Sequence, residues 1–128
     1  MSFTDSVSMA VQIPGGTPYS GTLTLVGNTE ENVDAPVNAN SQVEVDIQLI
    51  KANLQFLFLF CDQTITLKTN SSGAPQDTLN ITANVPYVWT VNLVPIFACP
   101  FSNNVTKIFV NSTVNVAANF ILRSVANN

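Results

Sequence analysis

The side chains of this chain that could do chemistry are carboxylates, because its 128 residues include no histidine and only four lysines and arginines. Three of the eight acidic residues, Glu30, Glu31 and Asp34, stand close together in one segment. Oxygen ligands on a loop suit calcium, but their spacing matches no EF-hand. A solvated acidic loop is the simpler interpretation, and we expect no metal site there.

A second pair of carboxylates, Glu44 and Asp46, lies two positions apart in an alternating segment. Glycosidases use two carboxylates, so a hydrolase is one hypothesis for the chain. Charges on the outer face of a strand are much more common, and they discourage association through strand edges. We therefore expect no catalytic residue and no enzymatic activity.

The two cysteines, Cys61 and Cys99, form no C-x-x-C pair, and no cation neighbours Cys99. Residues 1–10 lack the positive and apolar regions of a secretory signal, so we expect a reducing cytosol in which thiols stay free. A disulfide between the two cysteines remains the alternative.

The composition excludes further classes of function. Charged residues make up 9% of the chain, and the polarity comes instead from 16 asparagines, 13 threonines and 10 serines. Without histidine there is no Ser-His-Asp triad and no imidazole metal site. Four scattered cations form no basic face for nucleic acid. The most apolar run, 54–60, is too short to cross a membrane as a helix and predicts a buried strand, or a strand with an interface at one end.

The chain alternates apolar and polar residues with a period of two, which predicts strands. Nine segments are predicted to be strands, all but 54–60 by this alternation: 7–13, 22–26, 42–50, 54–60, 64–69, 78–82, 87–93, 105–111 and 114–125. Residues 27–40 are expected to form a loop, and 51–53 the turn of a hairpin. The run 54–60 is apolar on both faces, which indicates a central strand covered on both sides.

Eight or nine short strands predict an all-β fold, a single antiparallel β-sandwich in which a jelly roll is one arrangement that fits. We expect one domain over residues 1–128, with residues 1–6 as a flexible N-terminal arm. Trp89 and Tyr87 alternate with Val91 and Leu93, so packing in the core is favoured over stacking on a sugar or base.

Residues 57–79 carry a more specific pattern. A strand is followed by D-Q-x-[LI]-T-[LI]-x-T-N-S-S at 62–72 and by a P-x-D-T turn at 75–78. With 86–89, 100–102, 105–110 and a final alternating strand that contains Arg123, this pattern resembles small virion proteins of tailed bacteriophages. The resemblance covers roughly residues 43–125. It marks turns and core strands, so no functional residue is carried over from it.

The resemblance implies a virion structural protein of the capsid decoration or cement type. Such proteins are small and β-rich, and they sit at symmetry axes of the shell, often as trimers. The implied partners are the major capsid protein and further copies of this chain, with no nucleic acid, membrane or cofactor. The implied location is the capsid surface, after assembly in the host cytoplasm.

Four apolar residues are candidates for partner binding. Phe3 lies in the expected arm, and Ile96, Phe97 and Phe101 cluster in a proline-containing segment. These three either form a contact surface or cover an open end of the sandwich. A carbohydrate- or receptor-binding module of a phage tail or fibre is the alternative function, and it would need an exposed aromatic platform.

Overall fold

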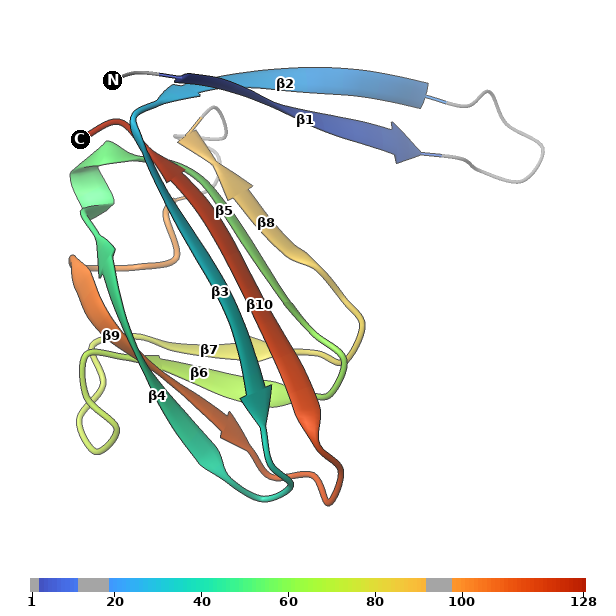
Figure 1. Cartoon of the computed structure of the whole chain (residues 1–128), viewed down its shortest axis with the longest axis vertical. Helices are drawn as coiled ribbons and strands as arrows, with labels where there is room; N and C mark the ends of the chain where they lie inside the picture. Colours follow the sequence, from blue (N-terminus) through green and yellow to red (C-terminus); the bar gives the residue numbers. More distant parts are fainter. Residues whose placement is uncertain (1–2, 12–18, 92–97) are drawn as a thin grey trace.

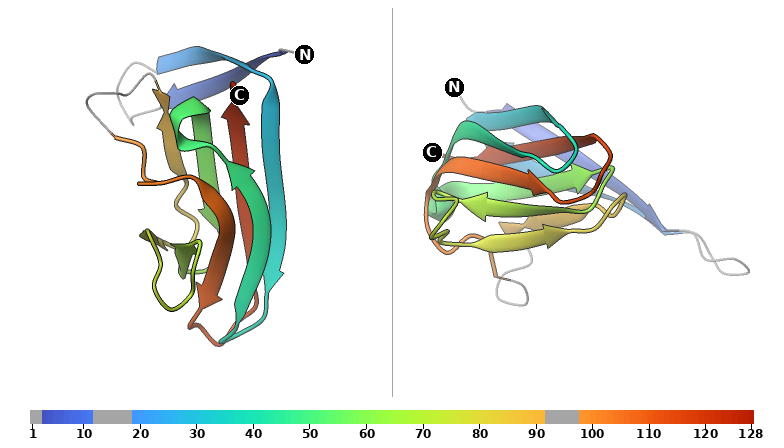
Figure 2. Two further views of the ribbon diagram at one scale, coloured as in Figure 1. Left: turned by 90° about the vertical axis from the view of Figure 1, so that its left-hand side faces the viewer. Right: turned by 90° about the horizontal axis from the view of Figure 1, so that it is seen from below.

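The computed structural model describes residues 3–11, 19–91 and 98–128, and for residues 3, 5, 7–11 and 19–23 it describes the backbone alone. Eight strands form two four-stranded sheets that face each other (Figures 1 and 2). Sheet I has the order β3 (Thr29–Val37), β10 (Ala118–Ala126), β5 (Leu54–Cys61) and β8 (Tyr87–Thr90). Sheet II has the order β4 (Gln42–Leu49), β9 (Val105–Ser112), β6 (Ile65–Thr69) and β7 (Thr78–Ile81).

A third sheet is a hairpin formed by β1 (Phe3–Val11) and β2 (Tyr19–Gly27). A short 3₁₀ turn, η1 (Lys51–Asn53), precedes β5. All the described strand pairs are antiparallel, which confirms the predicted all-β antiparallel sandwich. With the hairpin, the described residues contain ten strands, one more than the upper number predicted.

The core lies between the two sheets. Alternate residues of β5 and β10, among them Leu59 and Phe120, meet Leu67 of β6 and Ile108 of β9, and all four are fully buried. Trp89 is only 4% exposed, which confirms that it packs in the core. Burial of these alternating apolar side chains on one face of each strand is what holds the two sheets together.

The strands of the two sheets pair in a nested order. β3 pairs with β10 and β4 with β9, while β5 pairs with β8 and β6 with β7. The first strand of the sandwich is thus hydrogen-bonded to the last, and the pairing proceeds inward along the chain. Because of this nesting, the start of β3 and the end of β10 lie at the same end of sheet I (Figure 1).

The segment 27–40 was expected to be a loop, but it contains strand β3. Its Val33, Ala35 and Val37 are buried in alternation with exposed polar residues, a weak pattern that the acidic residues obscure in the sequence. Pro36 is tolerated because β3 is an edge strand, where a missing backbone N–H breaks no interior ladder.

Two further expectations on local structure were wrong. Residues 51–53 do not close a hairpin, because β4 belongs to sheet II and β5 to sheet I, so the turn crosses between sheets. Residues 3–6, expected to form part of a flexible arm, belong to β1 and pair with residues 24–27 of β2. The N-terminal extension is therefore the hairpin.

Side chains of residues 57–79 hydrogen-bond turns to other strands. Asn70 has φ of 64°, and its Oδ1 accepts a hydrogen bond from the Thr106 amide at 2.8 Å. The Asn70 Nδ2 donates to the Asn104 carbonyl oxygen at 2.8 Å. Asp62 accepts from the Asn119 amide at 2.7 Å, so it joins the end of β5 to the start of β10. Asn70 and Asp62 therefore stabilise the fold.

Substitution of Asn70 tests this role. Asn70→Ala removes the side-chain hydrogen bonds and leaves an alanine in the left-handed region, and we expect the free energy of unfolding in urea to fall by about 2–3 kcal/mol. Asn70→Gly loses the same bonds but adopts a positive φ freely, so its loss should be smaller. Equal stability of Asn70→Ala and the wild type would contradict this role.

Candidate interaction surface

The outer face of sheet I carries apolar residues in rows that run across its strands. Phe58 of β5 lies opposite Val88 of β8 and Arg123 of β10. In the next row, Phe60 lies opposite Ile121. Val88 is 43% exposed, and the other apolar residues of these rows are half-buried. We call Phe58, Phe60, Val88 and Ile121 the outer patch.

The two phenylalanines of the outer patch stack on each other. The ring centroids of Phe58 and Phe60 lie 6.5 Å apart, with the planes inclined by 10°. Stacked aromatic rings interact favourably beyond the area that they bury. Because both rings are only half-buried, the sandwich presents an apolar surface outside its core.

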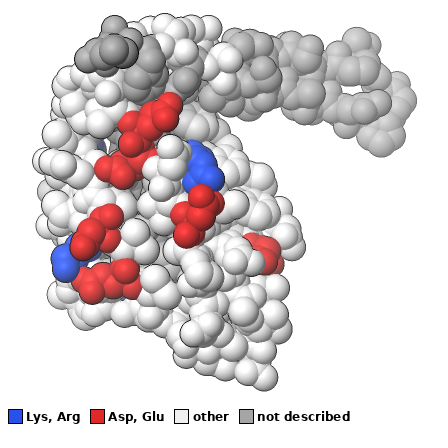
Figure 3. Space-filling view, viewed as in Figure 1, with Lys and Arg blue, Asp and Glu red and all other residues white. Residues whose placement is uncertain are grey.

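Charge next to the outer patch is neutralised within the chain. Arg123 donates from Nη2 to both oxygens of Asp34, at 3.0 and 3.1 Å, and from Nη1 to the Val33 carbonyl oxygen at 3.0 Å. The guanidinium thus ties β10 to edge strand β3. In Figure 3 each blue group on the visible face lies beside a red one, while other red groups have no blue neighbour.

The β1–β2 hairpin covers one end of this face. Leu25 of β2 is 2% exposed and packs with Phe56 and Val125 in a small second apolar cluster, against which Phe58 also packs. Residues 54–60 were expected to form a central strand covered on both faces, or a buried strand with an interface at one end. The outer face of β5 is covered at Phe56, whereas Phe58 and Phe60 remain half-buried.

The root of the hairpin is held tightly against β10. Gly27 is so close to β10 that an added Cβ would lie 2.6 Å from Val125 Cγ1 and 2.7 Å from the Ala126 carbonyl oxygen. The next amide, of Asn28, donates to that same carbonyl oxygen at 2.9 Å. The Asn28 Oδ1 in turn accepts from the Asn128 amide at 2.8 Å, so the C-terminus is tied to the hairpin root.

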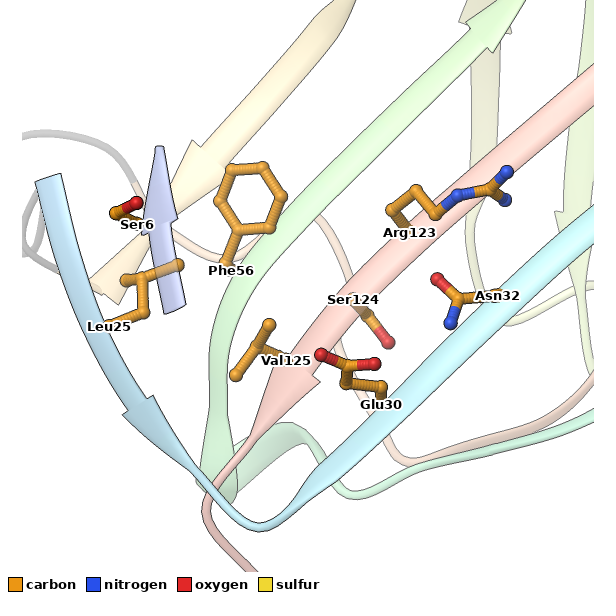
Figure 4. A pocket seen from close by; sticks show the side chains of 8 residues that line it. All are labelled: Ser6, Leu25, Glu30, Asn32, Phe56, Arg123, Ser124 and Val125. Carbon is orange, nitrogen blue, oxygen red and sulfur yellow. The ribbon is translucent and has the colours of Figure 1, made fainter. Parts of the chain in front are cut away.

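A pocket of about 250 Å³ lies where the hairpin meets sheet I (Figure 4). Its apolar side comes from the second cluster, and its polar side from β1, β3 and β10. The lining residues are Ser6, Leu25, Glu30, Asn32, Phe56, Arg123, Ser124 and Val125. The pocket continues the outer face of sheet I under the hairpin.

The predicted partner-binding residues are only partly described. Phe3 belongs to β1 and pairs with Gly27, while its side chain lies outside the described part. Ile96 and Phe97 fall in 92–97, also outside it. Phe101 is 1% exposed and belongs to the main core, so it does not contribute to a surface. Asp77 accepts a hydrogen bond from the amide of the adjacent Ser102 at 2.9 Å.

The carboxylates that were considered for chemistry make structural contacts. Lys107 Nζ lies 2.8 Å from Glu44 and 3.7 Å from Asp46, and the Glu44 carboxylate raises the pKa of Lys107. Glu31 accepts from the Gln48 amide of β4 at 3.3 Å, on the opposite face of β3 from Glu30 and Asp34. Over residues 3–11, 19–91 and 98–128, no three acidic or cysteine side chains gather to hold a metal ion.

Both cysteines are free thiols. Cys61 is buried in the main core, Cys99 packs at its margin, and burial raises the pKa of each. A raised thiol pKa lowers the thiolate fraction near neutral pH, which makes either residue a poor nucleophile. Their role in the described structure is packing.

Comparison with known proteins identifies no family for the chain. No family model and no curated protein matches the chain. A solved structure that matches is a de novo designed double-stranded β-helix, determined by NMR in solution. It shares 12% sequence identity, with 73% of this chain and 97% of that chain covered and a TM-score of 0.43. In the described part of the chain, no helix is long and apolar enough to cross a membrane.

The outer patch was not among the predicted contact residues, although the sequence contained a signal for it. The run 54–60 is apolar at both sets of alternate positions, which allows a doubly covered strand or an interface at one end. Only the strand order and the position of the hairpin separate these alternatives. Val88 and Ile121 come from distant segments, and only the pairing of β5 with β8 and β10 brings them together.

Substitution of Gly27 tests the seating of the hairpin. Gly27→Ala places a methyl group against the β10 backbone, which must shift, and we expect it to lower the free energy of unfolding in urea by about 1–3 kcal/mol. Amide exchange at Leu25 should accelerate as well. Gly73→Ala is the matched control, because nothing lies within 4 Å of its added Cβ, and its effect should stay within about 0.5 kcal/mol. Equal effects of the two substitutions would show that the root is not tightly packed.

Proposed function

We propose that this chain is a non-enzymatic virion structural protein of a tailed bacteriophage, a capsid decoration protein that binds the major capsid protein and stabilises the assembled shell. Its place would be the outer surface of the capsid. The observation that carries the binding role is the outer patch, an apolar face that the chain leaves half-covered. The assignment to a virus is inferred from the resemblance of residues 43–125 to small virion proteins of tailed bacteriophages.

The charge distribution supports action through protein contacts. Near the outer patch, the guanidinium of Arg123 is already hydrogen-bonded to Asp34 and to backbone carbonyl oxygens. A protein partner can therefore cover Phe58 and Phe60 without desolvating an unpaired charge. Few charges also limit electrostatic repulsion between neighbouring copies on a crowded shell.

The fold supports the same assignment. We infer that the nested strand pairing is that of a jelly roll, in which eight strands wind into two four-stranded sheets. Jelly rolls are common among viral capsid domains. Two sheets packed through a shared core suit a protein that reinforces a shell.

Binding to shells tests the proposal. Shells assembled from the major capsid protein without this chain should bind the purified chain saturably in co-sedimentation. The affinity should change little when salt is raised from about 0.1 M to about 1 M, because few charges are available to be screened. Glu44→Gln and Asp46→Asn should bind like the wild type.

Two results would contradict the proposal. One is the absence of saturable binding to such shells. The other is selective binding to a saccharide on a glycan array, which would support the carbohydrate- or receptor-binding alternative. The burial of Trp89 removes the aromatic residue best suited to a sugar platform.

A further inference from the structure

The outer face of sheet I contains an arrangement of three residues, one from each of three neighbouring strands. Phe56 of β5 lies opposite Val125 of β10, and Val125 lies opposite Glu30 of β3. Opposed residues of antiparallel strands share a face and stand close together. In Figure 4, Phe56 and Val125 lie toward Leu25, and Glu30 lies beyond Val125. We call Phe56, Val125 and Glu30 the first socket.

The same arrangement occurs again four residues along each strand. Phe60 lies opposite Ile121, and Ile121 lies opposite Asp34. Each strand keeps its chemical type, which is a phenylalanine on β5, a β-branched aliphatic residue on β10 and a carboxylate on β3. A rise of about 3.3 Å per residue places the two arrangements roughly 13 Å apart. We call Phe60, Ile121 and Asp34 the second socket.

The first socket is filled by the chain itself. Leu25 of β2 packs on Phe56 and Val125, and all three side chains are buried. β2 pairs with β1 in a sheet of its own, so Leu25 meets sheet I through side-chain packing and not through strand pairing. Thr24 and Val26, the neighbours of Leu25 in the sequence, are uncharged. The first socket therefore accepts an aliphatic side chain from an extended segment.

The second socket presents the same apolar pair with less cover. Phe60 and Ile121 are half-buried, whereas Phe56 and Val125 are buried. Among the described residues, no aliphatic side chain buries the second pair as Leu25 buries the first. Covering Phe60 and Ile121 would remove apolar surface from water, which is the same driving force that seats Leu25.

The charges at the second socket restrict what can fill it. Asp34 accepts two hydrogen bonds from Arg123, and Asp62, two residues after Phe60, accepts one from the Asn119 amide. These side chains comprise two carboxylates and one guanidinium, so negative charge is in excess. A segment that brought a further carboxylate beside its aliphatic side chain would be repelled.

We propose that the second socket takes a leucine or a similar aliphatic side chain from an extended segment of the major capsid protein, with no acidic residue next to it. The identity of this partner rests on the proposed function, because the socket is part of the outer patch. The existence of the socket rests on the repeated arrangement within the chain.

The seated hairpin indicates an extended segment as the occupant. β2 crosses this face near the ends of β5 and β10, and it contacts both strands. Two strand spacings within a sheet amount to roughly 10 Å, so the roughly 13 Å between the sockets leaves room for another extended segment beside the hairpin. Such a segment would cross the same two strands and repeat the contact of Leu25 one socket further along.

A small leucine analogue tests the second socket without any partner protein. We expect N-acetyl-leucinamide at about 0.1 M to shift the NMR signals of Phe60 and Ile121, since one partly buried side chain binds weakly. The signals of Phe109, which is half-buried on the outer face of sheet II, should shift less. N-acetyl-serinamide at the same concentration is the control for the apolar group, and Phe60→Thr should abolish the shift at Ile121.

The first socket supplies a positive control. Leu25→Ala removes the side chain that fills it, so N-acetyl-leucinamide should shift the signals of Phe56 and Val125 in this variant and not in the wild type. Circular dichroism and urea unfolding establish that Leu25→Ala and Phe60→Thr retain the sandwich.

Photo-cross-linking on shells identifies the occupant. Phe60 is replaced by the photoreactive aromatic residue benzoylphenylalanine, and the chain is irradiated after binding to shells of the major capsid protein. Mass spectrometry should locate the cross-link at a leucine, isoleucine or methionine in an extended segment of that protein. The same replacement at Phe109 should give little cross-linking to the capsid protein.

The two experiments separate the socket from the proposed function. Equal shifts with the leucine and serine analogues would overturn the socket, whether or not the chain binds shells. On shells that bind the chain, a cross-link from position 60 to a helix, to another copy of the chain or to no protein would overturn the extended segment as occupant. Shells that bind no chain would overturn the proposed function and the named partner, while a leucine-specific shift would leave the socket standing.

Discussion

The structure depends on one constraint, which is that β5 is apolar on both faces. Its inner face supplies Leu57 and Leu59 to the core between the sheets. Its outer face presents Phe56, Phe58 and Phe60, which the core cannot use. The chain covers Phe56 with Leu25 of the hairpin and leaves the next two phenylalanines half-buried. A surface of this kind is stabilised when another protein covers it.

The scarcity of charge likewise leaves surfaces that another protein can cover. Arg123 is bound to Asp34 and Lys107 to Glu44, and most remaining polarity is neutral. Asparagines instead make directed contacts at turns and chain ends, as Asn70 does toward β9 and Asn28 toward the C-terminus. The result is a sandwich that is fixed by hydrogen bonds at its ends and presents an apolar face on its side.

Much of the fold could be predicted from alternation, because burial of one strand face produces a period of two wherever the other face is polar. Residues 42–49 and 65–69 follow this rule closely. β3 was missed because Pro36 and three carboxylates resemble a loop, and only its pairing with β10 reveals an edge strand. Strand order is a long-range property, so the sequence indicated neither the crossover at 51–53 nor the neighbours of β5.

The candidate site was harder to predict for the same reason. Phe101 was expected either at a contact surface or over an open end of the sandwich, and it lies in the core, beside the hydrogen bond from Ser102 to Asp77. The outer patch combines β5, β8 and β10, and no local pattern marks Val88 and Ile121 as neighbours of Phe58 and Phe60. Its one local sign was the run 54–60, in which the apolar residues exceed what a single buried face needs.

The central claim is that protein covers the outer face of β5 when the chain functions. Hydroxyl-radical footprinting of the wild type measures this directly, with Phe109 as the internal reference, because Phe60 and Phe109 are both half-buried in the single chain. The account predicts that oxidation of Phe60 falls relative to Phe109 when the chain is bound to shells. An unchanged ratio of the two oxidation rates on shells would contradict it.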